Sequence, residues 1–302
     1  MAWRKSSQQT NILYGIALVI ILYVCFLGIR VVRASALFAR HDRINVAFYG
    51  EEATILSFGL TDNVNYIVSL SHEQKISIPG GYNEYPLGSL GKLVGLQKDP
   101  AILQRTFSSM ISAFVTYYVS PKHAKVYEKP DTDEPEYQKI HLIKSLFSSS
   151  NMTNMNILDK VYIGYLIAKR RQQDFVVLRS TVLRDQDDGT RIFSEKSFLK
   201  KYKGFFYHQT LREEGLEVQL KYSVYKSAVT LSRVIEGQGI RVVDLAQSER
   251  NNPQCILRTR MPDTNNTVRF LSRAFKCIVE AGDTEGVDIV IYLGKDLERL
   301  WE

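Results

Sequence analysis

Two adjacent carboxylates, Glu51 and Glu52, are the first residues of this sequence whose type and place could do chemistry. They follow Gly50, which ends the run RINVAFY at residues 43–49. Carboxylate oxygens are ligands that Mg²⁺ accepts in proteins. A metal-binding or ligand-binding loop is one hypothesis for this pair, and a solvated turn is the other.

A second candidate is the string Pro79-Gly80-Gly81, which follows the β-type run at residues 75–78. Proline fixes φ, whereas the two glycines permit positive φ. Successive backbone N–H groups in such a loop can surround a phosphate. The sequence therefore leaves two interpretations open here, a phosphate-binding loop and a connecting turn.

Several common catalytic and metal-binding patterns are missing from the sequence. It contains no C-x-x-C, no H-E-x-x-H and no G-x-S-x-G string, so neither a zinc site nor a serine hydrolase of the usual kind is expected. No two of its histidines have the spacing of metal ligands. These histidines are His41, His72, His123, His141 and His208.

Of the three cysteines, Cys25 lies in an apolar run, which leaves Cys255 and Cys277 in the polar part of the chain. In an oxidising compartment the two could form a disulfide. Two buried thiols are the alternative, since free cysteine is among the most buried residue types.

The composition is that of a folded chain with a basic surface. The sequence is 45% hydrophobic and 24% charged, with a formal net charge of +7. Such a balance permits contact with anionic lipid or an anionic polymer. The basic residues are spread along the chain without a long arginine or lysine tract, so nucleic acid is not an expected partner.

The candidate residues lie between elements that alternate along the first two thirds of the chain. Apolar and β-branched residues predict strands, and apolar residues three and four apart predict helices. The pattern indicates one α/β domain over residues 44–212. Its strands are expected at 43–49, 53–58, 65–70, 75–78, 115–119 and within 174–183, and its helices at 87–96, 100–114, 140–147 and 156–171.

A second, smaller unit is expected over residues 216–302. Its order is strand, helix, strand, strand, helix, strand, which predicts a small α/β sandwich with the helices on one face. The strands are expected at 216–222, 240–245, 255–259 and 288–293, and the helices at 227–236 and 267–275.

An uncharged apolar run at residues 12–29 precedes both units. As a helix it would reach about 27 Å, which is enough to cross the core of a bilayer. We expect a transmembrane helix over residues 12–33 after a cytoplasmic tail at 1–11. A cleaved signal ending near Ala34-Ser35-Ala36 is the alternative. Basic residues flank the run on both sides, so charge does not decide the orientation.

The layout and three short strings resemble the LytR-CpsA-Psr family of cell-envelope proteins. The strings are RINVAFYG, ISIPGGY and Arg171-Gln172-Gln173. Residues 216–302 resemble the LytR C-terminal domain. The resemblance implies a single-pass protein of the cell membrane with its C-terminal part outside the cytoplasm. It also implies transfer of polyprenyl-pyrophosphate-linked glycopolymers to peptidoglycan, with Mg²⁺ and arginines at the pyrophosphate, and adds Arg171 to the candidate ligand-binding residues.

The sequence departs from the family pattern at the residues that would do this chemistry. No arginine follows Gly50, and Gly80 and Gly81 stand where the family typically has an arginine and an aspartate. These departures predict a protein that binds a wall or lipid-linked polymer and requires no cofactor. The alternatives are an active phosphotransferase, which would need Mg²⁺, and a scaffold for other proteins.

Overall fold

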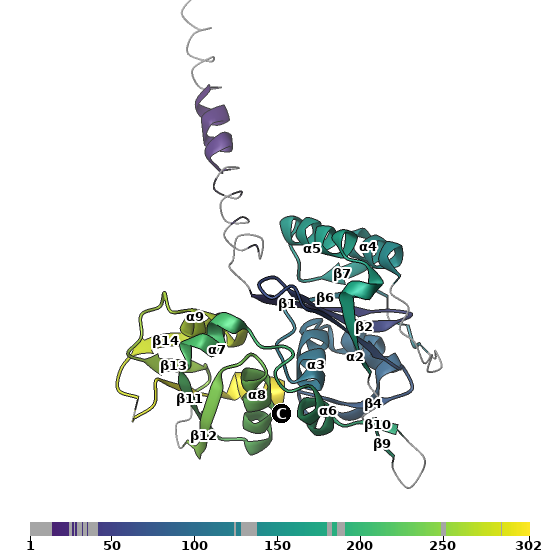
Figure 1. The fold of residues 1–302 in the computed structure, drawn as a ribbon. Coiled ribbons are helices and arrows are strands. Elements are labelled where there is room, and N and C mark those ends of the chain that lie inside the picture. The colour runs from purple at the N-terminus through teal and green to yellow at the C-terminus, as the bar shows by residue number, and fades with distance from the viewer. Residues whose placement is uncertain are drawn as a thin grey trace, which may run out of the picture.

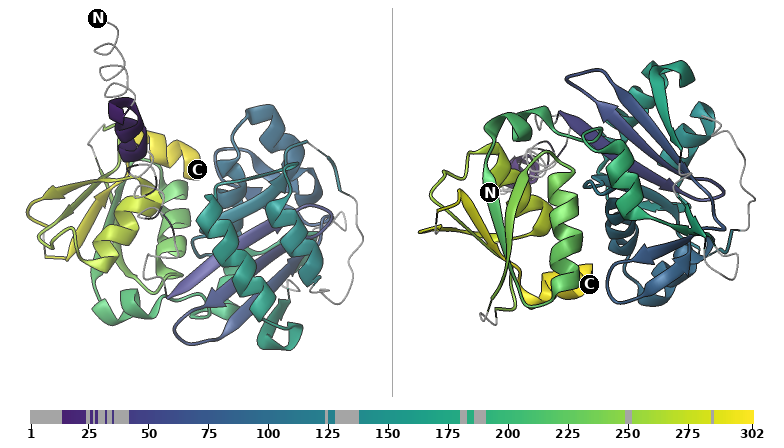
Figure 2. Two further views of the ribbon diagram at one scale, coloured as in Figure 1. Left: turned by 90° about the horizontal axis from the view of Figure 1, so that it is seen from above. Right: turned by 60° about the horizontal axis from the view of Figure 1, so that its bottom comes forward.

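The chain folds into two α/β bodies, which lie side by side in Figures 1 and 2, and a helix at residues 14–23 that leads away from them. The computed structural model describes residues 14–23, 26, 28, 32, 35, 42–123, 125–127, 138–179, 183–185 (backbone), 191–248, 252–284 and 286–302.

A six-stranded mixed sheet forms the centre of the N-terminal body, with the order β7-β6-β1-β2-β3-β8. β1 is antiparallel to β2 and parallel to β6, so it lies in the interior of the sheet. The strands are β1 (Arg43–Tyr49), β2 (Ala53–Gly59), β3 (Asn65–Leu70), β6 (Tyr117–Pro121), β7 (Asn151–Thr153) and β8 (Phe175–Arg179).

Helices cover both faces of this sheet, which explains why every residue of β1 and β2 is buried. Side chains alternate between the two faces of a strand. Ala47 and Tyr49 belong to the core that contains α2 (Leu90–Gln97) and α3 (Ala101–Ile111). Val46 and Phe48 belong to the core that contains α4 (Lys139–Phe147) and α5 (Ile157–Lys169).

A four-stranded sheet, β5-β4-β10-β9, lies beyond α3. It contains β4 (Lys75–Ile78), β5 (Asn83–Pro86), β9 (Leu183–Asp185) and β10 (Arg191–Phe193). The strand expected within residues 174–183 is β8, and the additional strand β9, which begins at Leu183, belongs to this second sheet. The N-terminal body also contains η1 (Leu87–Ser89), η2 (Gln172–Asp174) and α6 (Glu195–Tyr202), whereas α7 (Gln209–Glu214) packs in the C-terminal body through Leu211.

The C-terminal body is a five-stranded sheet of order β12-β11-β15-β13-β14. Its predicted βαββαβ core is present, and the structure adds β14 and the final helix α10. Val218 and Leu220 of β11 point into one core with α8, α9 and α10, so the helices share one face. The elements are β11 (Glu217–Tyr222), α8 (Tyr225–Glu236), β12 (Arg241–Gln247), β13 (Ile256–Thr259), α9 (Asn266–Phe275), β14 (Ile278–Ala281), β15 (Ile289–Tyr292) and α10 (Lys295–Trp301).

A disulfide joins Cys255, immediately before β13, to Cys277, immediately before β14. The two strands are parallel neighbours. The bond therefore closes the β13–α9–β14 unit at the base of both strands. A cross-link that closes a loop of this size stabilises a fold by about 3 kcal/mol in the chain-entropy model.

Two contacts fix the seam between the bodies. A Cβ at Gly237, which follows α8, would lie 1.6 Å from the Ser112 carbonyl oxygen, so the chain segments touch backbone to backbone. Glu195 of α6 accepts a hydrogen bond from Ser109 Oγ at 2.8 Å and forms an ion pair with Arg233 of α8 at 2.5 Å.

Nine of the 22 residues of the segment predicted to span the membrane, residues 12–33, lie outside the described residues. Of this segment, residues 14–23 are helical, and their side chains are exposed. No helix in the described part of the chain is both long and apolar enough to cross a membrane.

Candidate functional site

A small pocket opens where the turn between β1 and β2 meets α4. Its volume is about 30 Å³, which is room for one or two water molecules or one small polar group. The lining comes from the two strands, their turn, and one side of α4. It consists of Phe48, Tyr49, Gly50, Glu51, Glu52, Thr54, Ile67, Gln138, His141, Leu142 and Ser145.

The backbone of the turn is held by a buried histidine. His72 Nε2 lies 3.1 Å from the carbonyl oxygen of Glu51. Because a carbonyl oxygen accepts hydrogen bonds and cannot donate them, this ring nitrogen carries the hydrogen. The His72 ring stacks on Tyr127, with 5.4 Å between the ring centroids. The turn that carries Glu51 and Glu52 is thus held in place by His72, which is itself packed on Tyr127.

Tyr49 continues this support at the end of β1. Its hydroxyl accepts a hydrogen bond from the Gly91 N–H at 2.9 Å and donates one to the Gly88 carbonyl at 2.9 Å. Burial raises the pKa of the Tyr49 phenol. Burial also raises the pKa of Tyr127, and the negative charge of Glu51 raises it further. Both phenols are therefore neutral at physiological pH and act as hydrogen-bonding groups.

The lining contains carboxylates, an imidazole, an amide and hydroxyl groups, but no lysine or arginine. These groups donate and accept hydrogen bonds in the way that a hydroxyl-rich ligand requires. A pyrophosphate requires cationic partners such as arginine forks or a divalent ion. Within the described residues no group of three or more His, Cys, Asp or Glu side chains is arranged to hold a metal.

The string Pro79-Gly80-Gly81 lies elsewhere, in the turn of the β4–β5 hairpin. Ile78 pairs with Asn83 across the turn, and the two glycines have φ of +101° and +80°. A Cβ at Gly80 would lie 3.7 Å from the Leu300 carbonyl oxygen of α10. None of the three residues lines the pocket. Their positive φ values are those of a tight connection between strands.

Arg171 also lies apart from the pocket lining. Its side chain is exposed, and its backbone N–H donates a hydrogen bond to Asp174 Oδ2 at 2.7 Å. The residue is therefore part of the N-terminal cap of η2. The structure does not bring Arg171, the glycine turn and the Glu51–Glu52 turn together.

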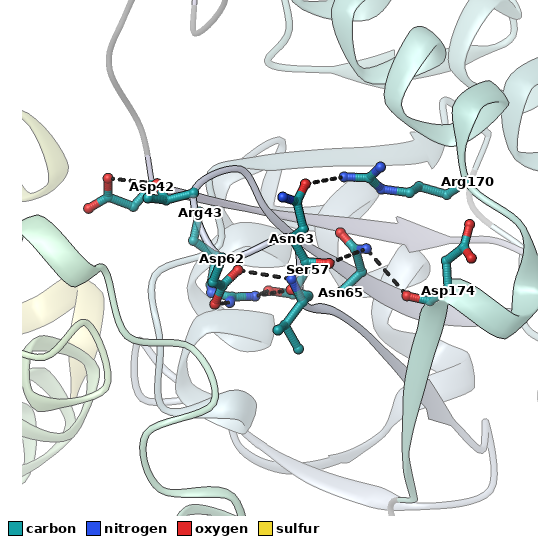
Figure 3. A network of polar contacts seen from close by, with 10 residues as sticks. Asp42, Arg43, Ser57, Asp62, Asn63, Asn65, Arg170 and Asp174 are labelled. Carbon is teal, nitrogen blue, oxygen red and sulfur yellow. Dashed lines mark hydrogen bonds and ion pairs between the residues drawn. The ribbon is translucent and has the colours of Figure 1, made fainter.

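A buried arginine occupies the other end of β1. The Arg43 guanidinium lies 2.7 Å from Asp62, and it donates hydrogen bonds to Ser57 Oγ at 3.0 Å and to the Val64 carbonyl at 3.1 Å (Figure 3). Seven residues of strand separate this end from Gly50, about 20 Å at the usual rise. Arg43 therefore fastens the loop between β2 and β3 and does not serve the pocket.

The α4 half of the pocket was not predicted from the sequence. His141 and Ser145 lie one helical turn apart, on the side of α4 that meets the turn. They are about 90 residues from Glu51, and no spacing rule connects a strand turn to a helix so far along the chain. The helical pattern at 140–147 was the available signal, and it located the helix without showing what the helix faces.

Comparison with known proteins gives structural neighbours. No family model matches the sequence. No curated protein matches it. Among solved structures, TagT bound to LI-WTA is 9% identical, with 54% of this chain and 88% of that chain covered at a TM-score of 0.38. TagV of B. subtilis is 8% identical, with 53% and 97% covered at 0.34.

A third neighbour is the LytR-CPS2A-psr family protein YwtF (TagT) with bound octaprenyl pyrophosphate lipid. It is 11% identical, with 53% of this chain and 90% of that chain covered at a TM-score of 0.34. The structural neighbours are LytR-CpsA-Psr proteins, the family that the sequence resembles.

Proposed function

We propose that this chain is a single-pass protein of the cell envelope whose two bodies lie outside the cytoplasm and bind a lipid-linked or wall glycopolymer without transferring it. One observation carries the second half of this proposal. The pocket at the β1–β2 turn presents Glu51, Glu52 and His141 with no lysine or arginine on its lining.

The chemistry of phosphoryl transfer explains why this lining matters. Negative charge develops on the pyrophosphate oxygens as the bond breaks, and catalysis requires cations placed at those oxygens. Two carboxylates at the same place repel the leaving group. Carboxylates are good acceptors for sugar hydroxyl groups, because a hydrogen bond to a charged group contributes about 1.5–3 kcal/mol. The pocket thus favours a glycan over a pyrophosphate.

Two features support the envelope location. The side chains of the helix at residues 14–23 are exposed, including Ile16, Leu18 and Leu22, and such a surface needs an apolar environment to cover it. Disulfides persist in oxidising compartments outside the cytoplasm, and the Cys255–Cys277 bond is of this kind. A membrane anchor would cover the exposed apolar helix, and a C-terminal part outside the cytoplasm would keep the disulfide oxidised.

The test is calorimetry on the full chain in nanodiscs with two ligands. One ligand is a polyprenyl-pyrophosphate-linked glycan, and the other is the same polyprenyl pyrophosphate without sugar. We expect the glycan to bind without Mg²⁺ and the bare lipid to bind much less. Glu51→Gln with Glu52→Gln should weaken glycan binding about 10- to 100-fold, which corresponds to the loss of one or two charged hydrogen bonds.

The matched control is Glu84→Gln, an exposed glutamate of β5 away from the pocket. It should leave binding unchanged. A transfer assay with peptidoglycan as acceptor accompanies the binding experiment, and we expect no product. Mg²⁺-dependent binding of the bare lipid that is lost in the double variant, or glycopolymer transferred to peptidoglycan, would replace this proposal with an active phosphotransferase.

A further inference from the structure

The outer surface of the α4–α5 pair is apolar. Five large side chains on the two helices are between 48% and 70% exposed. On α5 they recur every four residues and so form one stripe along the helix. They are Ile140 and Phe147 of α4 and Ile157, Val161 and Tyr165 of α5. The opposite side of each helix packs on the six-stranded sheet, so this stripe is not part of the core.

The same helices are strongly basic. Residues 139–171 contain six lysines and arginines and one acidic residue, Asp159, which gives a formal charge of +5. The cations are Lys139, Lys144, Lys160, Lys169, Arg170 and Arg171. Asp159 is 3% exposed, so its negative charge is buried and does not offset the cations at the surface. An apolar stripe flanked by cations is the pattern of a helix that lies in the interface of an anionic membrane.

The chain itself fastens this surface next to the predicted span. Ser35 is buried, and its Oγ donates a hydrogen bond to Asp159 Oδ1 at 2.7 Å. Asp159 lies in the first turn of α5. Ser35 follows the predicted end of the span, residue 33, by two residues, so the chain leaves the bilayer directly at the start of α5. In Figure 1 the helix at residues 14–23 rises on the side of the molecule where α4 and α5 lie.

We propose that the outer face of α4 and α5 contacts the anionic bilayer surface, with Ile157, Val161 and Tyr165 inserted among the lipid headgroups. This proposal rests on the membrane anchoring proposed above. The hydrogen bond between Ser35 and Asp159 holds the face close to the predicted span. The stripe supplies apolar area, and the cations complement the lipid charge. Gln138 and His141 of the pocket lie at the start of α4, so the pocket would open beside the membrane, where the headgroup of a lipid-linked ligand lies.

The test uses the full chain in nanodiscs of phosphatidylcholine and phosphatidylglycerol, in a Cys25→Ser background. A bimane fluorophore is attached through Val161→Cys in one protein and through Leu96→Cys in the other. Leu96 is a matched control, because it is 68% exposed against 56% for Val161 and lies at the end of α2, on the other face of the sheet. Spin-labelled lipid should quench bimane at position 161 several-fold more than at position 96.

A charge variant tests the lipid chemistry. Lys160→Glu with Lys169→Glu should reduce quenching at position 161 in the anionic bilayer to near the level of position 96. Flotation with vesicles measures anchoring separately. A chain that floats but shows equal quenching at both positions would overturn the membrane-contacting face and leave the anchor intact.

Two other outcomes are equally informative. Bimane at position 161 that is shielded from an aqueous quencher but is not quenched by labelled lipid would mean that protein, such as a second copy, covers the face, and would overturn the proposal. A chain that does not float would overturn both the anchor and this inference.

Discussion

At the scale of single residues, Tyr49 does most to connect the pocket to the body. Its hydroxyl ties the end of β1 to the chain at Gly88 and Gly91, before and at the start of α2. Its ring meets His72 and Tyr127 edge to face, with centroids 6.0 and 5.7 Å apart. Since His72 holds the Glu51 carbonyl, the geometry of the pocket depends on this aromatic cluster.

Tyr49→Phe removes the hydroxyl and leaves the Gly91 N–H without its acceptor. An unsatisfied buried donor costs about 1–3 kcal/mol, so we expect a loss of that size in the free energy of unfolding, measured in urea. Tyr85→Phe is the control, since the Tyr85 hydroxyl has no hydrogen bond within the described part of the chain, and its change should stay within about 0.5 kcal/mol. Equal stability of the two variants would contradict the role given to Tyr49.

At the scale of elements, Glu214 at the end of α7 acts as the acceptor for the start of α9. Its carboxylate accepts hydrogen bonds from the Thr267 N–H at 2.9 Å, from Thr267 Oγ1 at 2.6 Å and from the Asn266 N–H at 3.2 Å. Burial raises the pKa of Glu214, but the hydrogen bonds from Thr267 and Asn266 outweigh it, and the net pKa is lowered.

The lowered pKa of Glu214 determines how the stability of the fold changes with pH. A carboxyl group whose pKa is lower in the folded state stabilises the fold above its unfolded pKa, and the contribution is lost as the pH falls through the folded value. We expect Glu214→Gln to destabilise the C-terminal body by about 1 kcal/mol at pH 7, as for a lost helix cap. The difference from the wild type should vanish in acid. The exposed neighbour Glu213→Gln is the control, and it should change the free energy of unfolding at pH 7 by less than about 0.5 kcal/mol. For Glu214→Gln, a difference that grows in acid would contradict the assignment.

The strands and helices that the sequence predicts well are those with a strong internal pattern. β1 is found at the predicted residues, because a run with four strand-forming residues, Ile44, Val46, Phe48 and Tyr49, ends at a glycine. β5 was missed, because Asn83–Pro86 is mostly exposed and is a strand through its pairing with β4. β14 is four residues long and owes its place to β13 beside it. Periodicity cannot identify a strand whose stability comes from its neighbour.

The candidate site was predicted only in part for a related reason. Glu51 and Glu52 line a pocket, whereas Pro79, Gly80, Gly81 and Arg171 do not. The phosphate-binding hypothesis came from the local Pro-Gly-Gly string alone, which does not show where its loop lies relative to the Glu51–Glu52 turn. In this fold the glycine turn belongs to a separate small sheet and reaches towards α10. Such long-range placement follows from sheet topology, which local spacing does not encode.

At the scale of the whole molecule, the two bodies are joined by a seam that includes a largely buried ion pair. The side chains of Arg233 and Glu195 are 22% and 10% exposed. Asp42, before β1, adds a further link by accepting a hydrogen bond from the Thr210 N–H of α7 at 2.7 Å. The C-terminal body is therefore docked on the N-terminal one and does not hang from a linker.

A double-mutant cycle measures this docking. Glu195→Gln, Arg233→Met and the combined variant should give a coupling energy of about 1–3 kcal/mol in thermal or urea unfolding. The exposed pair Glu217 and Arg241, 2.7 Å apart on the C-terminal sheet, is the control, and its coupling should stay below about 1 kcal/mol. Coupling in the seam no larger than in the control would mean that apolar and backbone contacts alone hold the bodies together.

The position of β1 also has a mechanical consequence. The strand begins at Arg43, ten residues after residue 33, the predicted end of the span, and ends at the turn that carries the pocket. Under the proposed function, a polymer held at the pocket and the membrane anchor that precedes Asp42 would pull on the two ends of this strand. β1 pairs with β2 over all seven of its residues and with β6 on its other side. These hydrogen bonds run across the strand, so such a pull acts on them together in shear, while the C-terminal body lies outside the line of force.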